Sequence, residues 1–275
     1  MMTRRQLLAS AAATAAVLPR LQADPIGVPI GTQLYPVRDL VAKDFGACLK
    51  QIAGLGYKNI ELCSPFTYRE FKGLADTRPA ELRDQFQSAG LRCVSCHFNF
   101  SELKQNTEER IAFAKALGLP QMVLSSFGLP ATATLDDWTR AATELNKVGE
   151  QVQKAGMQLG FHNHDGEFKE LDGTLIYDRL MKTFDPKLVK SQFQVSVIHL
   201  GFEAATYFKK YPGQFLSIHL QDYSAAQSKQ VAVGSGDVKW KELFAAAKTA
   251  GVKNYFVEMN LEFMEASQKF LHGLM

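Results

Sequence analysis

The sequence carries little net charge and lacks any long cluster of basic residues. Its 31 lysines and arginines are nearly balanced by 28 aspartates and glutamates, which leaves a formal charge of +3. Nucleic acids and anionic membrane surfaces attract proteins through concentrated positive charge, so we expect neither as a partner. The composition favours a small polar molecule instead.

Cysteine is also scarce, and its spacing does not complete a zinc site. Cys93 and Cys96 have the spacing of half a zinc ribbon, but no second pair exists. The surrounding residues are typical of a strand, in which side chains three apart point to opposite faces. We therefore expect Cys48, Cys63, Cys93 and Cys96 to be buried thiols, because a chain of 275 residues needs no disulfides to hold its core.

A glycine-rich phosphate loop is missing where a dinucleotide-binding fold would have one. The first predicted strand, Gly31 to Tyr35, continues directly into Pro36-Val37-Arg38-Asp39. Dinucleotide-binding folds place a glycine-rich turn at this point, so that fold is excluded. Linkers and low-complexity stretches are also lacking, which predicts a single domain.

The N-terminal segment resembles an export signal. Arg4 and Arg5 precede a weakly apolar, alanine-rich run through Leu18, and Leu21-Gln22-Ala23 follows before Asp24. This order is typical of a twin-arginine signal peptide, and the apolar run is too short for a permanent membrane anchor. We expect residues 1–23 to be the signal, cleavage after Ala23, a mature domain over 24–275, and a periplasmic location in a bacterium. The alternatives are an amphipathic leader or an uncleaved membrane tether. The twin-arginine route carries folded proteins, which suits a protein that takes up a metal before export.

After this segment, strand-like and helix-like patterns alternate about eight times. Such alternation, at about thirty residues per unit, is typical of a (β/α)8 TIM barrel, whose sheet is closed and parallel. The predicted strands are 31–35, 59–62, 92–96, 121–124, 158–161, 192–197, 215–220 and 255–258. The clearest predicted helices, by the spacing of their apolar residues, are 45–55, 79–89, 107–117, 135–154 and 240–250.

Glycines agree with these boundaries. Helices commonly end in a glycine, which adopts the left-handed backbone conformation at little cost. Five predicted helix ends have this feature: Gly56, Gly90, Gly118, Gly156 and Gly251.

Polar side chains gather at the predicted strand ends. In a TIM barrel the carboxyl ends of all the strands meet at one mouth, so these residues should form one site. Imidazoles and carboxylates that converge in this way suit a divalent ion such as manganese, cobalt, zinc or magnesium. A core role is the alternative for any single histidine. The strand-end residues are Gln33, Tyr35, Arg38, Glu61, His97, Ser125, Ser126, His162, Asn163, His164, Gln194, His219, Gln221, Asp222, Glu258 and Asn260.

Several of these segments resemble the sugar phosphate isomerase/epimerase family, which lies within the xylose isomerase-like TIM barrels. The similarity covers nearly the whole predicted mature chain in the same order, and it is specific for the superfamily but not for a substrate. It is carried by 33–39 (QLYPVRD), 161–168 (FHNHDGEF), 207–213 (YFKKYPG), 218–222 (IHLQD) and 257–258 (VE).

The resemblance implies a divalent metal at the ends of strands five to eight, held by His162, Gln194, His219 and Glu258. Three positions depart from the family pattern: Gln194 replaces an aspartate, Gln221 replaces a lysine, and Ser235 replaces the glutamate of a Gly-Glu-Gly motif. All three changes remove charge. An amide is a weaker oxygen ligand than a carboxylate, so we expect a lower metal affinity or a different ion.

The implied chemistry is removal of a proton next to a sugar carbonyl, with stabilisation of the resulting enediolate. The candidate catalytic residues are Glu61, His97, His164 and Glu258. The candidate substrate-binding residues are Gln33, Tyr35, Arg38, Gln221 and Trp240.

Isomerisation or epimerisation of a carbohydrate is the first functional hypothesis, and elimination from a 3-keto sugar or glycoside is its closest variant. The second hypothesis is a non-catalytic sugar-binding barrel, which the three lost charges favour. An endonuclease-like barrel is a third reading that the sequence disfavours, because such sites need more carboxylates and a basic face.

Overall fold

The computed structural model describes residues 25–274. The predicted signal segment 1–23, Asp24 and Met275 lie outside the described residues. Over residues 25–274, no helix combines the length and the apolar character needed to cross a bilayer.

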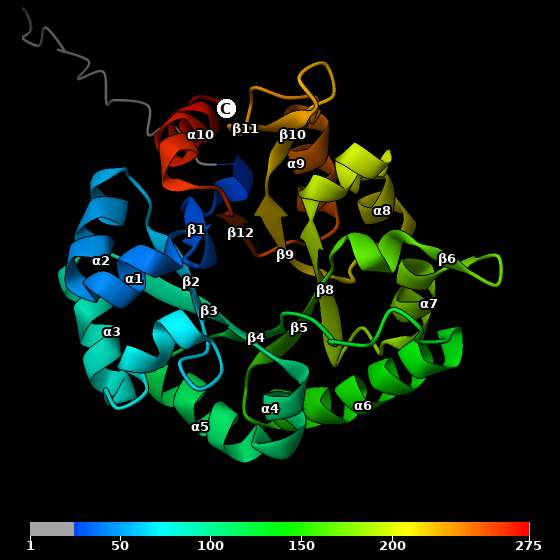
Figure 1. Cartoon of the computed structure of the whole chain (residues 1–275), viewed down its shortest axis with the longest axis horizontal. Coiled ribbons are helices and arrows are strands. Elements are labelled where there is room, and N and C mark those ends of the chain that lie inside the picture. The colour runs from blue at the N-terminus through cyan, green and yellow to red at the C-terminus, as the bar shows by residue number, and fades with distance from the viewer. Residues whose placement is uncertain (1–24, 275) are drawn as a thin grey trace, which may run out of the picture.

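Eight parallel strands close into a barrel, as the alternating pattern predicts (Figure 1). Their order around the barrel is β1-β12-β9-β8-β5-β4-β3-β2, so both chain ends of the sheet meet where β1 pairs with β12. The strands are β1 (Gly31–Gln33), β2 (Asn59–Cys63), β3 (Arg92–Phe98), β4 (Gln121–Leu124), β5 (Gln158–His162), β8 (Val189–Gln194), β9 (Phe215–Leu220) and β12 (Asn254–Val257).

Helices surround the strands and bury their apolar faces against them (Figure 1). The longest, α6 (Leu135–Lys154), begins at Thr134, whose hydroxyl accepts a hydrogen bond from the backbone N–H of Asp137. The others are α1 (Arg38–Lys43), α2 (Phe45–Gly54), α3 (Pro79–Ser88), α4 (Phe100–Gln105), α5 (Thr107–Leu117), α7 (Ile176–Thr183), α8 (Ala204–Lys210), α9 (Trp240–Thr249) and α10 (Leu261–Gly273).

The glycine and cysteine predictions are confirmed. The five glycines predicted at helix ends all have a positive φ, between 75° and 96°. The four cysteines are free thiols, and all but the partly exposed Cys93 are buried.

The sixth strand differs from its prediction. The apolar residues up to Val197 favour a strand over 192–197, but β8 ends at Gln194 and a 3-10 helix covers Val195–Leu200. The side chain of Gln194 accepts a hydrogen bond from the backbone N–H of Ser196, which turns the chain, while Val195 and Val197 stay buried. In this 3-10 helix the alternate residues Val195 and Val197 are buried, which gives the same sequence pattern as a half-buried strand. β1 is shorter than predicted for a similar reason, because Tyr35–Val37 forms a 3-10 helix that includes Pro36.

Polar residues, rather than aliphatic ones, fill much of the barrel interior. Residues two apart on a strand point to the same side, so Ser95 lies below His97, and Ser217 lies below His219. A bulge in β3 pairs Glu61 with Ser95 and directs both toward the interior. Hydrogen bonds from Gln121 to Ser95 and from Asn254 to Gln121 continue this network.

Two small hairpins extend from the barrel: β6 (Glu170–Leu171) with β7 (Thr174–Leu175), and β10 (Asp222–Ser224) with β11 (Lys229–Val231). The buried carboxylate of Asp222 organises the second hairpin and the loop after it. It accepts hydrogen bonds from the indole of Trp240 and from the backbone N–H groups of Tyr223, Gly234, Gly236 and Val238.

Substitution of Gly236 by alanine should loosen this loop. An added Cβ would lie 2.3 Å from Asp222 Oδ1 and 2.4 Å from the carbonyl oxygen of Tyr223. Relief of these clashes must displace the carboxylate, so we expect Gly236→Ala to lower the free energy of unfolding by about 2 kcal/mol, measured by urea denaturation. Gly54→Ala is the control, because a Cβ there meets nothing within 4 Å. Equal stabilities for the two variants would contradict the steric argument.

Candidate functional site

Three histidines converge inside the barrel mouth. His97 on β3, His162 on β5 and His219 on β9 are buried, and each offers a ligand nitrogen within 4.8 Å of the other two. Their ring centroids lie 4.5 to 5.1 Å apart. Strands β3, β5 and β9 bring them together because the inward face of each strand ends at a histidine.

Glu61 lies beside this histidine cluster and is fully buried. Its carboxylate contacts Nε2 of His219 and lies 3.1 Å from Nε2 of His97. It also accepts hydrogen bonds from the amide of Gln192 at 2.8 Å and from the hydroxyl of Ser95 at 2.5 Å. Every described polar neighbour therefore donates to this carboxylate or carries positive charge when protonated.

The pKa values of Glu61, His219 and His162 shift in different directions. Burial alone would raise the pKa of Glu61, but His97 and His219 lower it well below its ordinary value. Burial opposes charge on His219 as well, yet the carboxylates of Glu61 and Glu258 raise its pKa to about 10. Burial and the neighbouring rings of His219 and His164 instead lower the pKa of His162 well below the usual value, which keeps that ring neutral.

Glu258 follows β12 and lies at the upper side of the histidine cluster. Its carboxylate accepts a hydrogen bond from Gln194 and another from Gln221 at 2.9 Å, and it lies 3.2 Å from Nδ1 of His219. Burial would raise the pKa of Glu258, but His219 and the amide of Gln194 lower it, so the group is an anion. Its side chain is 14% exposed, so it reaches solvent-filled space.

Three cavities meet at this mouth, and two of them are here named the inner and the outer cavity; the third, of about 410 Å³, shares His164 with both. The inner cavity, of about 220 Å³, is lined by Gln33, Tyr35, Cys63, Tyr68, His97, Ser125, Ser126, His162, His164 and Glu258. The outer cavity, of about 520 Å³, is lined by Tyr35, Pro36, Arg38, His164, Asp165, Gly166, Gln194, Ser196, Gln221, Gln230, Glu258 and Asn260. Tyr35, His164 and Glu258 belong to both, so the cavities adjoin at these side chains.

Most of the residues singled out from the sequence meet at these cavities. Glu61, His219 and Gln192 form the buried floor beneath them. His164 is exposed at the mouth, where partial desolvation of its ring lowers its pKa although Glu258 opposes the shift.

Three sequence assignments are placed differently by the structure. Trp240, expected to bind substrate, is buried in α9 and donates its indole N–H to Asp222 at 2.9 Å, so it supports the loop and does not line either cavity. Gln194, expected to bind a metal, donates to Glu258, and neither is part of the histidine cluster although Glu258 was also expected to bind the metal. The third histidine of the cluster is His97, which was expected to be catalytic.

Several residues of the site were not identified from the sequence, among them Gln192, Gln230, Tyr68, Asp165 and Ser196. Gln192 could have been found, because it lies two residues before Gln194 on the same inward face of β8. Gln230 gave no such signal, since it lies on β11, outside the barrel strands, and reaches the mouth only through the hairpin.

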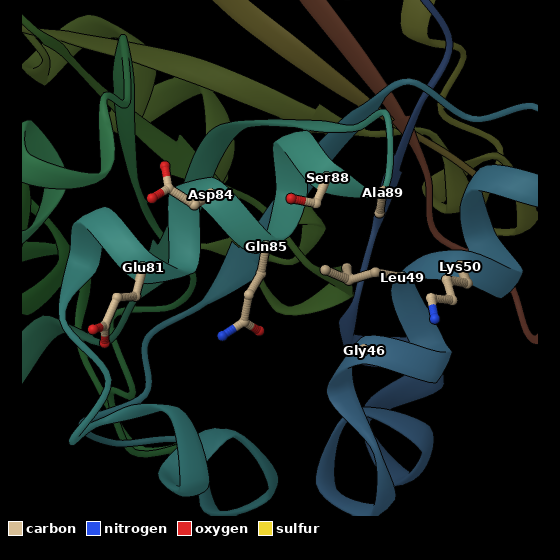
Figure 2. A pocket seen from close by; sticks show the side chains of 8 residues that line it. All are labelled: Gly46, Leu49, Lys50, Glu81, Asp84, Gln85, Ser88 and Ala89. Carbon is tan, nitrogen blue, oxygen red and sulfur yellow. The ribbon is translucent and has the colours of Figure 1, made fainter.

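A separate hollow of about 460 Å³ lies outside the barrel, between α2 and α3. Figure 2 shows that Leu49 of α2 extends toward Gln85 and Ser88 of α3, and that Lys50, Glu81 and Asp84 also line the hollow. These groups are exposed apart from Leu49, and the histidine cluster belongs to the other set of cavities. We therefore assign the site to the barrel mouth.

Comparisons with known proteins agree with the fold. The profile of the xylose isomerase-like TIM barrel family matches residues 49–270. An inosose dehydratase from Clostridium perfringens is 23% identical over 245 residues, covering 78% of this chain and 81% of the relative.

Solved structures show the same architecture. A sugar phosphate isomerase/epimerase from Parabacteroides distasonis superposes with a TM-score of 0.76 and 24% identity, covering 89% of this chain and 93% of the other. The IOLI protein with a binding zinc atom superposes with a TM-score of 0.64 and 14% identity, covering 90% and 94%. At these identities the structures establish the fold alone.

A buried carboxyl next to the site makes stability depend on pH. Glu167 is 3% exposed, and its carboxylate accepts a hydrogen bond from the backbone N–H of His164 at 2.8 Å. Burial raises the pKa of Glu167 from 4.5 to about 7, against the effect of that hydrogen bond. Between these values the folded protein holds a proton that the unfolded chain has lost, so stability falls as the pH rises.

We expect Glu167→Gln to remove this dependence, because the amide keeps an acceptor oxygen and cannot ionise. Relative to the variant, the wild type should lose up to about 3 kcal/mol of unfolding free energy between pH 4.5 and 7, measured by urea denaturation at several pH values. Parallel curves for the two proteins would show that Glu167 titrates normally.

Proposed function

The chain belongs to the xylose isomerase-like TIM barrel family. We therefore propose that it is an enzyme that isomerises or epimerises a carbohydrate, and that the reaction begins with removal of a proton next to the carbonyl group. One observation carries this proposal: an ionised carboxylate, Glu258, reaches a cavity that His97 and His162 also line. A base that shares a cavity with groups able to stabilise an oxyanion is the arrangement that enolisation needs.

Glu258 is the proposed base. The donors Gln194 and Gln221 orient its carboxylate, and His219 stabilises its negative charge. His97 and His162 line the same cavity, and either their rings or an ion that they hold would stabilise the oxygen on which negative charge develops. His164, whose lowered pKa keeps its ring neutral, is a second candidate base at the mouth. Glu258 would return the proton that it has taken to the neighbouring carbon, which completes an isomerisation.

Elimination is the second candidate outcome of the same first step. The curated relatives that match most of this chain are named inosose dehydratases, and dehydration also begins with loss of a proton beside a carbonyl. A leaving group on the next carbon would turn the enediolate toward elimination. Analysis of the products separates the two outcomes, because isomerisation keeps the molecular mass and dehydration lowers it.

We also propose a divalent metal at the histidine cluster. Among the described residues, Nδ1 of His162 is buried without a hydrogen-bond partner, and nitrogens of His97 and His219 lie within 4.8 Å of a His162 nitrogen. Three imidazoles suit zinc and other transition ions better than magnesium, and a carboxylate such as Glu61 commonly orients metal-binding imidazoles. A bound ion would polarise the substrate carbonyl. The residues present therefore fit a metal, held by His97, His162 and His219.

We further propose that the protein acts after export, because residues 1–23 have the order of a twin-arginine signal. An exported enzyme would meet unphosphorylated sugars, since sugar phosphates are mainly cytoplasmic. Fractionation of the native bacterium tests this location, and full-length protein confined to the cytoplasm would contradict it.

Replacement of the proposed base should abolish proton exchange. We expect Glu258→Gln to slow deuterium uptake from solvent into a panel of free and 3-keto sugars by about 10²- to 10⁴-fold, measured by NMR. Glu265→Gln is the matched control, because Glu265 is exposed on α10 and pairs with Lys269. Absence of uptake by the wild-type protein would reject the enzymatic proposal for those sugars.

Loss of a cluster histidine should reduce the metal content. We expect about one ion per chain in protein purified from native cells, and about a tenfold or greater loss of affinity in His162→Gln, measured by elemental analysis after dialysis. His199→Gln is the control, because His199 lies outside the cluster and pairs with Asp165 at 3.2 Å. Equal metal content in the two variants would exclude the histidine cluster as the metal site.

A further inference from the structure

We propose that the outer cavity is a subsite for a second sugar unit, so that the substrate is an uncharged glycoside or disaccharide whose reacting ring occupies the inner cavity. This inference rests on the proposed function, because the inner cavity is identified by the base and the histidines. The outer cavity has more than twice the volume of the inner one, at about 520 Å³ against 220 Å³. A single small sugar in the inner cavity would leave this larger space unused.

Neutral hydrogen-bonding groups dominate the lining of the outer cavity. Gln194, Gln221, Gln230 and Asn260 supply amides, and Ser196 supplies a hydroxyl. Amides both donate and accept hydrogen bonds, as sugar hydroxyls do, so they match a polyhydroxylated ring without requiring charge on it.

The charged groups disfavour a phosphate. Arg38 is the one side chain with a permanent positive charge among the described residues that line the two cavities. Its guanidinium donates to the carbonyl oxygen of Tyr35 at 3.0 Å and lies 4.5 Å from the centre of the Tyr35 ring. Asp165 and Glu258 line the same cavity and would repel an anion. The lining therefore favours an uncharged ligand.

Tyr35 provides an aromatic surface where the cavities adjoin. Over residues 25–274, Tyr35 and Leu200 are the large apolar side chains that are exposed, and Tyr35 is 40% exposed. Arg38 and an edge-on contact with Tyr68, at 6.0 Å between centroids, hold the ring in place. An immobilised aromatic ring beside hydroxyl-binding amides suits the apolar C–H face of a sugar ring.

The part of the outer cavity that Gln221 and Gln230 line is organised before a ligand arrives. The carboxylate of Asp222 holds the loop that follows β11, and β11 carries Gln230. The amide of Gln230 donates to Oε1 of Gln221 at 2.8 Å, which directs the Gln221 amide toward Glu258. A wall that is already ordered costs little conformational entropy on binding, so its hydrogen bonds contribute to affinity.

Calorimetric titration of the purified protein with cellobiose, maltose and trehalose, compared with glucose and glucose 6-phosphate, tests the subsite. We expect at least one disaccharide to bind more tightly than glucose, and glucose 6-phosphate to bind no better than glucose. In Gln230→Ala and Tyr35→Ala, the ratio of disaccharide to glucose affinity should fall by about fivefold to tenfold. Leu200→Ala is the control, because Leu200 is equally exposed but lines neither cavity.

The subsite is rejected if no disaccharide binds more tightly than glucose, if glucose 6-phosphate binds best, or if both variants keep the wild-type ratio. Binding does not require turnover, so the subsite and the reaction fail separately. Disaccharide binding that depends on Gln230, without deuterium exchange, would keep the subsite and reject the enolisation. Deuterium exchange on monosaccharides without disaccharide binding would keep the enolisation and reject the subsite.

Discussion

The site depends on a carboxylate that has no contact with solvent. Glu61 is fully buried inside the barrel, where an isolated negative charge would be very unfavourable. Its partners come from three other strands: Ser95 and His97 on β3, Gln192 on β8 and His219 on β9. Closure of the barrel is therefore required for the charge to be stable, and the same closure brings the histidines together.

Charged side chains form the buried floor of the site, and amide side chains lie nearer to solvent. Glu258 stands at the boundary, between His219 below and the amides of Gln194 and Gln221. An aspartate at position 194 would bring a second carboxylate against Glu258, an arrangement that needs a cation or a shared proton between them. The amide of Gln194 removes this need, because it donates a hydrogen bond. The loss of charge at position 194 is thus compatible with an intact site, whose proposed metal ligands lie deeper, at the histidines.

The hairpin of β10 and β11 gives the mouth a wall that the barrel strands do not supply. Asp222 directly follows Gln221 at the end of β9, and it satisfies five donors of the loop and of Trp240. The tryptophan therefore contributes to the site only by supporting this loop. Residues that shape the outer cavity depend on this local network rather than on the sheet.

Local rules determined most of the fold from the sequence alone. Apolar spacing and the helix-ending glycines predicted the barrel strands and five of the helices to within a few residues, with β8 as the main exception. Short-range periodicity and glycine conformation are properties of adjacent residues, so the sequence alone reveals them. The strand-end rule likewise brought Glu61, His97, His162, His219 and Glu258 to one mouth. Tertiary structure alone decided which of them touch. The contact of His219 with Glu61 spans 158 residues, and that of Gln192 with Glu61 spans 131. Such contacts depend on the register of the closed barrel and on side-chain packing, which no local pattern encodes. For the same reason the sequence did not reveal that Gln194 pairs with Glu258, that Trp240 turns away from the cavities, or that Gln230 reaches them.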